Sequence, residues 1–342
     1  MKLSIITINF NNAEGLRKTL ASVAAQTYAN IEHIIVDGGS TDGSVEVIRA
    51  YEASLASNLS PLTSNLKWIS EKDKGIYNAM NKGIEIALGK RIVNDDHTSS
   101  PLASRLSPDS LSEYIQILNS GDILAAPDVT ERMMAALALQ VRGYSLEVKG
   151  NENSIAENTA LSPNSLITSS PIENGPAIFY GNMIKEYPDG RRVKDTCGGG
   201  EYTPESFLYF YKGTLNHDCA YIRRDLFEKY GLYNEEMKIC SDWEWYVRAI
   251  VLGGEKTVYT DIDVTVFDMM GISESGGKNR ELIIKERREY LESIFPAAVL
   301  RDYDKYAFPI SQYQRLKKYH LWGIVYFMER VLFKFEKWFN KG

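Results

Sequence analysis

The feature that most constrains the fold is a strand, polar loop and helix pattern that occurs three times near the N-terminus. The apolar segments Leu3–Phe10, Ile31–Val36 and Leu66–Ile69 have the composition of buried strands. Each is followed by a polar loop and then by a segment with helical spacing of its apolar residues. This alternation predicts an α/β, Rossmann-like three-layer sandwich with a mostly parallel central sheet. Tyr114–Leu118 is predicted to be a fourth strand.

Polar side chains stand where the predicted strands end. The strand ends and the loops that follow them carry Asn9, Asp37, Asp73 and Asp122. In open α/β sheets, ligands bind beyond the carboxyl ends of the strands, so we expect these residues to face one crevice. The charge of −6 and the pI near 5.5 argue against a nucleic acid as the ligand, because such binding depends on clustered Lys and Arg.

The second strand end is typical of a nucleotide contact. A carboxylate at Asp37 would accept hydrogen bonds from a base or a ribose. Gly38 and Gly39 would allow the backbone to approach a flat ring. The alternative is a plain Asp-Gly turn in which Ser40 or Asp42 caps the next helix.

The third loop leads directly into a predicted helix, Ile76–Leu88. Backbone N–H groups near Gly75 would lie at the positive end of that helix and could face a diphosphate, with Asn81 reaching from the second turn. Asp122 follows an apolar strand and a glycine, where a carboxylate could hold Mg²⁺ or Mn²⁺ against phosphate oxygens. A helix cap is the alternative for Asp122, and more strongly for Asp128.

A candidate base lies far downstream, in the segment Cys240-Ser241-Asp242-Trp243-Glu244-Trp245. Asp242 is predicted at the first turn of a helix, where partial burial beside Trp243 could adjust its proton affinity for general-base work. It could instead be only a favourable charge at a helix N-terminus, and Glu244 could be the base.

Four motifs in order carry a family resemblance: Thr7-Ile8-Asn9-Phe10-Asn11, Ile35 to Gly43, Asp73 to Gly83, and Leu118-Asn119-Ser120-Gly121-Asp122. The chain resembles family-2 inverting glycosyltransferases of the GT-A fold, of the bacterial cell-surface polysaccharide type. The resemblance covers about Lys2 to Ala138 and returns at Phe179 to Ile250. It implies a nucleoside-diphosphate sugar donor, a divalent cation and inversion of the anomeric carbon.

The resemblance also assigns roles. Asp242 corresponds to the catalytic base, Asp122 to a metal ligand, and His217 to a polar residue near the acceptor. The donor-binding residues it implies are Thr7, Asn9, Asp37, Asp73, Gly75, Asn81, Asn119 and Gly121. The chain departs from many relatives in two places, because Asn119 and Gly121 replace an Asp-x-Asp motif and Met80 replaces an arginine; Lys74 or Lys82 could take over the arginine's role.

The domain organisation follows from the same pattern. We expect one catalytic domain over residues 1–295, with polar insertions near 90–112 and 143–175 that are either lids or surface excursions. A helical tail is expected over 296–342. Three widely spaced cysteines without a CxxC pair suggest neither a zinc site nor a disulfide framework, and a reducing, cytoplasmic location fits them best.

The tail differs from the rest of the chain in charge. Arg315 to Gly342 holds seven Lys or Arg and two Asp or Glu, although the whole chain carries −6. Leu321, Ile324, Met328, Leu332, Phe335 and Phe339 share one helical face. The tail could pack on the main domain, or it could lie on an anionic membrane surface at the inner face of the cell membrane.

The function predicted from these features is transfer of a sugar, from a donor that is UDP-linked, to an acceptor hydroxyl on a glycan or a lipid-linked molecule in cell-surface polysaccharide or glycolipid synthesis. One alternative is a sugar-nucleotidyltransferase, although no early glycine-rich segment with Arg and Lys is present to bind a triphosphate. The other is a non-catalytic nucleotide-binding scaffold of the same fold. The sequence also leaves a homodimer open.

Overall fold

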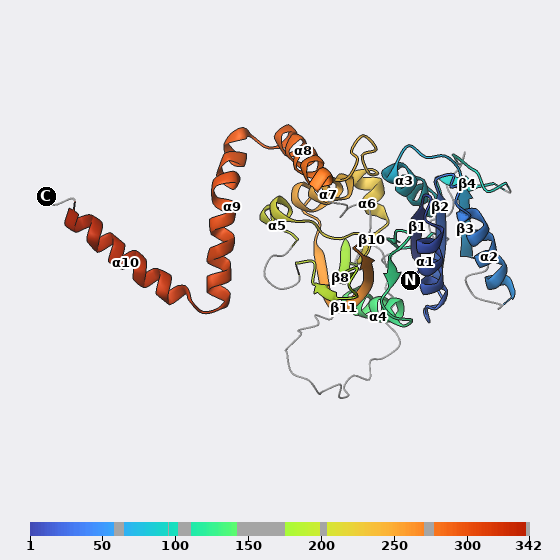
Figure 1. The fold of residues 1–342 in the computed structure, drawn as a ribbon, viewed down its shortest axis with the longest axis horizontal. Helices are drawn as coiled ribbons and strands as arrows, with labels where there is room; N and C mark the ends of the chain where they lie inside the picture. The colour runs from blue at the N-terminus through green and yellow to red at the C-terminus, as the bar shows by residue number, and fades with distance from the viewer. Residues whose placement is uncertain are drawn as a thin grey trace, which may run out of the picture.

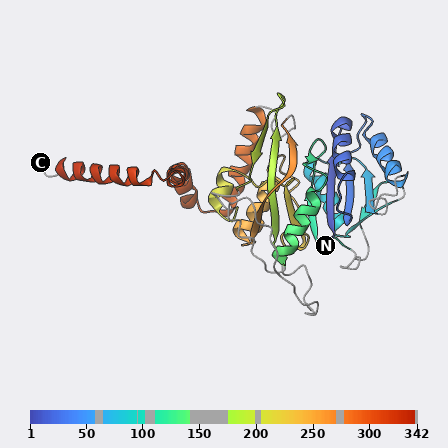
Figure 2. The ribbon, with the colours of Figure 1, turned by 90° about the horizontal axis from the view of Figure 1, so that it is seen from below.

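The computed structural model describes residues 1–57, 65–94, 96–101, 111–141, 175–198, 204–269 and 277–339. A large mixed sheet lies at its centre, with helices on both faces (Figures 1 and 2). The strands are β1 (Leu3–Asn9), β2 (Ile31–Asp37), β3 (Leu66–Ser70), β4 (Arg91–Val93), β5 (Ser99–Pro101), β6 (Tyr114–Ile117), β7 (Ile123–Leu124), β8 (Ile178–Glu186), β9 (Arg192–Asp195), β10 (Ala220–Arg223) and β11 (Thr257–Asp268). The helices are α1 (Ala13–Ala24), α2 (Ser44–Ser57), α3 (Ile76–Ala87), α4 (Val129–Val141), α5 (Phe207–Lys212), α6 (Asp225–Tyr230), α7 (Ser241–Tyr246), the π-helical η3 (Val247–Leu252), α8 (Gly277–Ile294), α9 (Ala297–Lys318) and α10 (Trp322–Phe339).

The strand order of the sheet is β3-β2-β1-β6-β10-β8-β11-β7, with β9 paired to β8. The first four strands are mutually parallel, as the sequence predicts. Strand β10 runs antiparallel to both of its neighbours, β7 and β9 are also antiparallel to theirs, and β8 and β11 are parallel to each other. The predicted α/β sandwich of the GT-A type, with a mixed and mostly parallel sheet and C-terminal helices, is therefore confirmed.

The register of the parallel strands places their carboxyl ends side by side. Asn9 pairs with Asp37 across β1 and β2, and Asp37 pairs with Ser70 across β2 and β3. Strand β6 continues this edge, since the Ser120 N–H donates to the carbonyl oxygen of Ile8 at 3.0 Å. The polar loops predicted to face one crevice therefore start from neighbouring points.

The two faces of the sheet are covered by different helices. Side chains alternate across a strand, so His33 faces α2, where its ring contacts the Tyr51 hydroxyl at 3.1 Å. Val36 faces the opposite side and packs with Ile6 under Gly83 of α3; a Cβ at Gly83 would lie only 2.4 Å from Cγ2 of Ile6. This close approach explains why α3 contacts both β1 and β2 and is buried along most of its length.

The two predicted insertions differ in how much of them is described. The first contains β4 and β5, which form a small antiparallel pair, and it is held to the main sheet by His97, whose ring stacks on Trp68 at 3.6 Å. Residues 102–110 lie outside the described part. The second insertion, 143–175, also lies outside it, except for Gly175, whose carbonyl oxygen accepts a hydrogen bond from Arg223.

Of the three C-terminal helices, the first packs on the rest of the protein and the other two extend away from it. Helix α8 packs on it, with Leu291 buried and the Glu286 carboxylate accepting the backbone N–H groups of residues 238–240. Helices α9 and α10 then extend away from the sheet (Figure 1). Within the described residues, no helix combines the length and the apolar character needed to span a bilayer.

Candidate functional site

The first part of the candidate site is a hydrogen-bonded cluster at the ends of β1, β2 and β3. The buried Asp37 carboxylate accepts hydrogen bonds from Asn9 Nδ2 at 2.8 Å, from Ser70 Oγ at 2.7 Å, and from both the backbone N–H and the hydroxyl of Ser40 at 2.9 and 2.6 Å. The Asn9 side-chain oxygen is buried but has no hydrogen-bond partner within the described structure. A buried acceptor without a partner requires an explanation, and an ordered water or a bound ligand would supply one.

The loop between β3 and α3 closes over this cluster at Gly38. A Cβ on Gly38 would lie 2.3 Å from Oδ2 of Asp73, so only glycine allows this approach. The Asp73 carboxylate accepts the N–H of Gly75 at 3.0 Å. Burial, and secondarily the nearby Asp37 charge, raise the pKa of Asp73. The structure therefore brings Asn9, Asp37 and Asp73 together, as predicted.

Asp242 lies where three distant segments meet. It stands in the first turn of α7, and its Oδ1 accepts the hydroxyl of Tyr77, on α3, at 3.0 Å. Its Oδ2 lies 3.3 Å from Nδ1 of His217. Nε2 of His217 lies 3.2 Å from Nδ2 of Asn119, which follows β6. A chain of polar contacts thus runs from a strand end, through the imidazole, to the candidate base and on to α3.

The electrostatics of this chain favour an ion pair. Burial opposes ionisation of Asp242, but the hydrogen bonds and positive charge of His217 outweigh it, with help from Tyr77, and lower the pKa of Asp242. Burial likewise opposes charging of His217, but Asp242 and the nearby Asp218 and Asp122 raise the pKa of His217. Burial, followed by the Asp242 charge, raises the pKa of Tyr77 well above its usual value, so its hydroxyl stays a donor.

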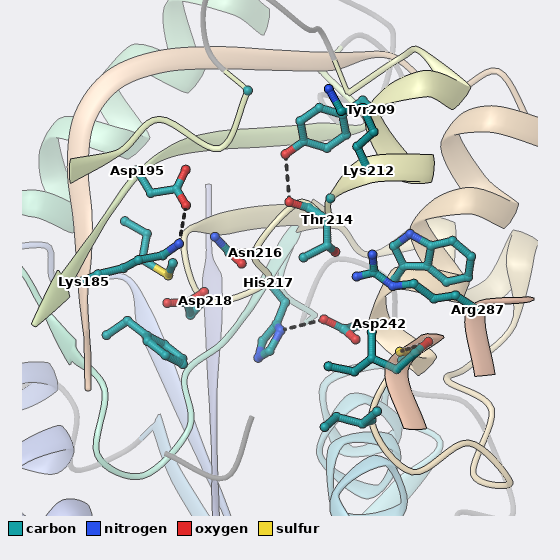
Figure 3. A pocket seen from close by; sticks show the side chains of 18 residues that line it. Lys185, Asp195, Tyr209, Lys212, Thr214, Asn216, His217, Asp218, Asp242 and Arg287 are labelled. Atoms are coloured by element: carbon teal, nitrogen blue, oxygen red, sulfur yellow. Dashed lines mark hydrogen bonds and ion pairs between the residues drawn. The ribbon is translucent and has the colours of Figure 1, made fainter. Parts of the chain in front are cut away.

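A cavity of about 520 Å³ opens beside Asp242 and His217 (Figure 3). Its walls come from β8, β9, α5, the loop before β10, α7 and α8. Charged side chains line much of it: Lys185, Asp195, Lys212, Asp218, Asp242 and Arg287. Its volume falls in the range typical of small-molecule pockets. None of the residues in the Asp37 cluster lines this cavity. Asp242 lines it and is linked through Tyr77 to α3, the helix that follows Asp73 and Gly75 in the chain.

Two predicted donor-binding residues point elsewhere. Thr7 is fully buried, and its hydroxyl lies 3.0 Å from Nε2 of His33 on the face of the sheet covered by α2. Asn81 uses both ends of its amide on the loop after α6, because Nδ2 donates to the Tyr233 carbonyl at 2.9 Å and to Glu235 at 3.0 Å, while Oδ1 accepts the Tyr233 N–H at 3.0 Å. The structure thus gives Thr7 and Asn81 packing contacts away from the Asp37 cluster.

Other backbone groups in the predicted motifs already have partners. The Gly75 N–H donates to Asp73, as described above, and the Gly121 N–H donates to the Thr19 hydroxyl at 3.0 Å. Both glycines have positive φ, 135° and 112°, which explains why glycine occupies these turns. The side-chain amide of Asn119 lies 3.2 Å from Nε2 of His217, and its buried oxygen has no partner in the described structure. When His217 is protonated, Nε2 is a donor, and the amide oxygen is the end of Asn119 that can accept its hydrogen bond.

The predicted metal ligand, Asp122, is buried and turned toward the end of β11. Its Oδ1 accepts the backbone N–H of Asp268 at 3.2 Å. Burial, and then the charge of Asp218, raise the pKa of Asp122 well above its usual value. Across the described ranges, no group of three or more His, Cys, Asp or Glu side chains is arranged to hold a metal ion.

Lys74 and Lys82, which could take over the role of the arginine that Met80 replaces, lie in different surroundings. Met80 is 1% exposed, so its side chain is part of the core. The Lys82 ammonium is held 3.0 Å from Glu71 and donates to the Lys72 carbonyl at 3.0 Å. Lys74 lies in the exposed loop just before α3.

The sequence motifs did not single out Tyr77, Asp218 or Arg287 for a role. Tyr77 stands within a quoted motif, but its partner Asp242 is 165 residues away. Asp218 directly follows His217, and its buried carboxylate accepts the Thr265 hydroxyl at 3.0 Å. Arg287 lies on α8, outside every motif. A local sequence pattern carries no signal for such long-range contacts.

The structure has two halves: a parallel α/β half with a carboxylate cluster at its strand ends, and a second half that presents Asp242 beside a cavity. The S. aureus protein TarS, residues 1–349 in complex with UDP-GlcNAc, shares this fold with a TM-score of 0.51 and 16% identity, over 87% of this chain and 69% of that one. The same TarS fragment in complex with UDP aligns with a TM-score of 0.49, and this chain spans 60% of its length.

Residues 4–101 match the model of glycosyl transferase family 2. An uncharacterized glycosyltransferase of Mycobacterium tuberculosis, Rv1514c, is 25% identical over 82% of this chain and 78% of its own length. The PGL/p-HBAD biosynthesis glycosyltransferase of Mycobacterium bovis BCG is 24% identical, over 83% and 81%. These matches confirm the resemblance to family-2 glycosyltransferases that the motifs indicate, and they support a glycosyltransferase activity for the chain.

Proposed function

We propose that this glycosyltransferase inverts the anomeric carbon of a UDP-sugar and transfers the sugar to an acceptor hydroxyl, with Asp242 as the base, in the synthesis of a cell-surface polysaccharide or glycolipid. The observation that carries the proposal is the position of Asp242. Its carboxylate contacts Tyr77 on the helix that follows the donor-side loop, and it also lines the cavity beside His217. A base in this position can reach an acceptor hydroxyl in the cavity while the donor occupies the strand-end cluster.

The chemistry follows from these groups. Asp242, ionised because its pKa is lowered, accepts a hydrogen bond from the acceptor hydroxyl. The acceptor oxygen bonds to the anomeric carbon from the face opposite the diphosphate, the bond from that carbon to the diphosphate oxygen breaks, and the acceptor proton passes to Asp242. Because one displacement occurs, the anomeric configuration inverts. Tyr77 and His217 orient the carboxylate, each through one of its oxygens.

The donor assignment is supported by the Asp37 cluster and by the names of similar proteins. Asp37 and the partnerless oxygen of Asn9 are acceptors suited to the N–H and hydroxyl groups of a nucleoside. The TarS structure with the same fold is a complex with UDP-GlcNAc. The M. bovis relative is named for PGL/p-HBAD biosynthesis, and we propose a related glycan or lipid-linked acceptor for this chain.

The proposal includes a divalent cation, Mn²⁺ or Mg²⁺, for which the described residues offer only a few ligands. Asp122 and Asp218 are buried carboxylates. Burial, and then the charge of Asp218, raise the pKa of Asp122, and a cation would relieve the repulsion between the two groups. The described side chains provide no set of three ligands, so the donor's phosphate oxygens would have to complete the coordination. A bound cation would offset charge on the departing diphosphate.

The decisive experiment compares Asp242→Asn with Asp189→Asn, a matched change at an exposed carboxylate on the β8–β9 turn. UDP-sugar hydrolysis and transfer are measured with Mn²⁺ present, and donor binding is measured by calorimetry. We expect Asp242→Asn to lose about 100-fold or more of the turnover rate while it binds the donor normally, because the base acts only in the chemical step. Binding without turnover by the wild-type protein, across a donor panel, would favour the scaffold alternative.

We also propose that the tail attaches the enzyme to an anionic membrane surface. On α10, Ile324, Met328 and Leu332 are 59%, 58% and 60% exposed and share one helical face, and the tail is basic. Such a helix binds through apolar burial and attraction to anionic lipids. We expect the protein to sediment with phosphatidylglycerol vesicles but not with phosphatidylcholine vesicles, less at high salt, and less after Leu332→Asp. Equal sedimentation with both lipids would refute the proposal.

A further inference from the structure

The first insertion packs against the loop that carries Asp73, a contact that the proposed function does not use. This loop, residues 71–75, joins β3 to α3 and is called the donor loop below. Strand β4 of the insertion contacts both β3 and α3 (Figure 1). We propose that the insertion holds the donor loop in place for a nucleoside diphosphate, with Glu71 as the positioning residue. The inference rests on the proposed function, because it concerns the same donor.

The insertion first meets the end of β3, just before the donor loop. The carbonyl oxygen of His97 accepts the N–H of Ser70 at 2.9 Å, and the His97 ring stacks on Trp68 with the ring centres 3.6 Å apart. The Ser70 hydroxyl in turn donates to the Asp37 carboxylate at 2.7 Å. The insertion therefore reaches the Asp37 cluster through a single intervening residue.

Glu71, the first residue of the donor loop, is held from two sides. Its carboxylate accepts the backbone N–H of Ser99, in β5, at 2.8 Å and the Ser99 hydroxyl at 3.0 Å. The Lys82 ammonium, on α3, lies 3.0 Å from the same carboxylate. Burial opposes ionisation of Glu71, but the hydrogen bonds from Lys82 and Ser99 outweigh it and lower the pKa of Glu71. Hydrogen bonds to an ionised group are the stronger kind, so one side chain joins the insertion, the loop and the helix.

The position of the donor loop matters because the loop packs on the glycine turn that follows β2. The Glu71 N–H donates to the Asp37 carbonyl oxygen at 3.0 Å. A Cβ on Gly39 would lie 3.3 Å from the backbone nitrogen of Lys72, so the two backbones approach closely. A shift of the loop would therefore move the Asp73 carboxylate relative to the Asp37 cluster. A displacement of about 1 Å is enough to weaken the contacts of a ligand that touches both.

The test is calorimetric titration of UDP, with Mn²⁺ present, into the wild type, Glu71→Ala, Glu71→Gln, Ser99→Ala and the double variant Glu71→Ala/Ser99→Ala. We expect Glu71→Ala to raise the Kd for UDP about tenfold at unchanged stoichiometry. Glu71→Gln should raise it less, because its amide oxygen still accepts a hydrogen bond. Ser99→Ala should raise it about threefold, since its backbone N–H still reaches Glu71. The double variant should bind no more weakly than Glu71→Ala, because both changes break the same contact.

Thr98→Ala is the matched control, because it removes the neighbouring hydroxyl of the same insertion. The Thr98 hydroxyl donates to Asp96 at 2.7 Å and accepts from Asn94 at 3.0 Å, both within the insertion. Thr98→Ala should therefore bind UDP as the wild type does. If Glu71→Ala does not fold, Ser99→Ala compared with Thr98→Ala makes the same test.

A purely structural role for Glu71 would give a different result. It would lower the fraction of molecules that bind UDP and leave the Kd of the remainder unchanged. That result, or a Kd for Ser99→Ala equal to that of Thr98→Ala, would overturn the proposal. A wild-type protein that binds UDP but transfers no sugar would overturn the proposed function and leave the positioning role intact, so the two failures are distinguishable.

Discussion

The substitution Gly38→Ala tests the donor side of the site with a single methyl group. The new Cβ would lie 2.3 Å from Oδ2 and 3.1 Å from Cγ of Asp73, and 3.2 Å from Cδ2 of Phe10. An ordinary contact needs at least 3.4 Å, so the Asp73 carboxylate has to move by about 1 Å. The Asp37 side of the turn cannot yield instead, because that carboxylate is fixed by Asn9, Ser40 and Ser70.

The expected magnitude follows from what Asp73 loses. Its carboxylate accepts the Gly75 N–H at 3.0 Å, and a hydrogen bond to a charged group contributes about 1.5–3 kcal/mol. If the displaced carboxylate blocks the donor, the affinity falls by a similar free energy, which is about 10- to 150-fold in Kd.

The assay is calorimetric titration of UDP into the wild type and Gly38→Ala, at a temperature where both are folded. Gly323→Ala, on the exposed α10 helix, is the control, because nothing lies within 4 Å of its added Cβ. Alanine favours a helix over glycine by about 1 kcal/mol, so this variant should be slightly more stable and bind UDP normally. A Kd for Gly38→Ala within twofold of the wild-type value would refute the assignment of this turn to the donor site.

Two predictions concern pH. His217→Asn should move the acid limb of the pH–rate profile to higher pH, because the imidazolium lowers the pKa of Asp242; an unchanged limb would contradict the role of Asp242 as the base. Burial lowers the pKa of His33 to about 3, so its neutral form is favoured in the fold, and the stability it contributes is present above about pH 6.5 and lost as the pH falls toward 3. Urea unfolding at pH 6.5 and pH 5 should show a loss of about 2 kcal/mol from this group that is missing in His33→Gln, and equal losses in both proteins would count against it.

The arrangement of the strand ends could be predicted from the sequence because it depends on local patterns. Apolar runs followed by Asn9, Asp37 and Asp73 specify both the strands and the loops, and parallel pairing then places the loops at one edge. Thr7 could not be placed in the same way. Thr7 precedes Asn9 by two residues in the same strand. Its hydroxyl contacts His33, and this contact holds the side chain in the core beneath α2.

The contacts of the second half of the protein lie beyond such patterns. Strand β10 has only four residues, and its antiparallel pairing with β6 depends on a partner about a hundred residues earlier in the chain. Asn81 similarly lies within a motif that indicates a ligand, but both ends of its amide form hydrogen bonds with the backbone of Tyr233. Only the folded chain shows which of two polar partners such a side chain takes.

Helix α3 links the donor side of the site to the proposed base. Its N-terminus adjoins Asp73, its first turn carries Tyr77 on Asp242, and its second turn carries Asn81 on the loop before α7. Asp242 is held ionised by His217, so it is a weak base in the resting enzyme. Proton transfer to it becomes favourable as the acceptor oxygen bonds to the anomeric carbon and its proton grows more acidic. A carboxylate of this kind needs accurate orientation more than a high pKa. Helix α3 supplies that orientation through the Tyr77 hydroxyl, and the same helix borders the proposed donor site.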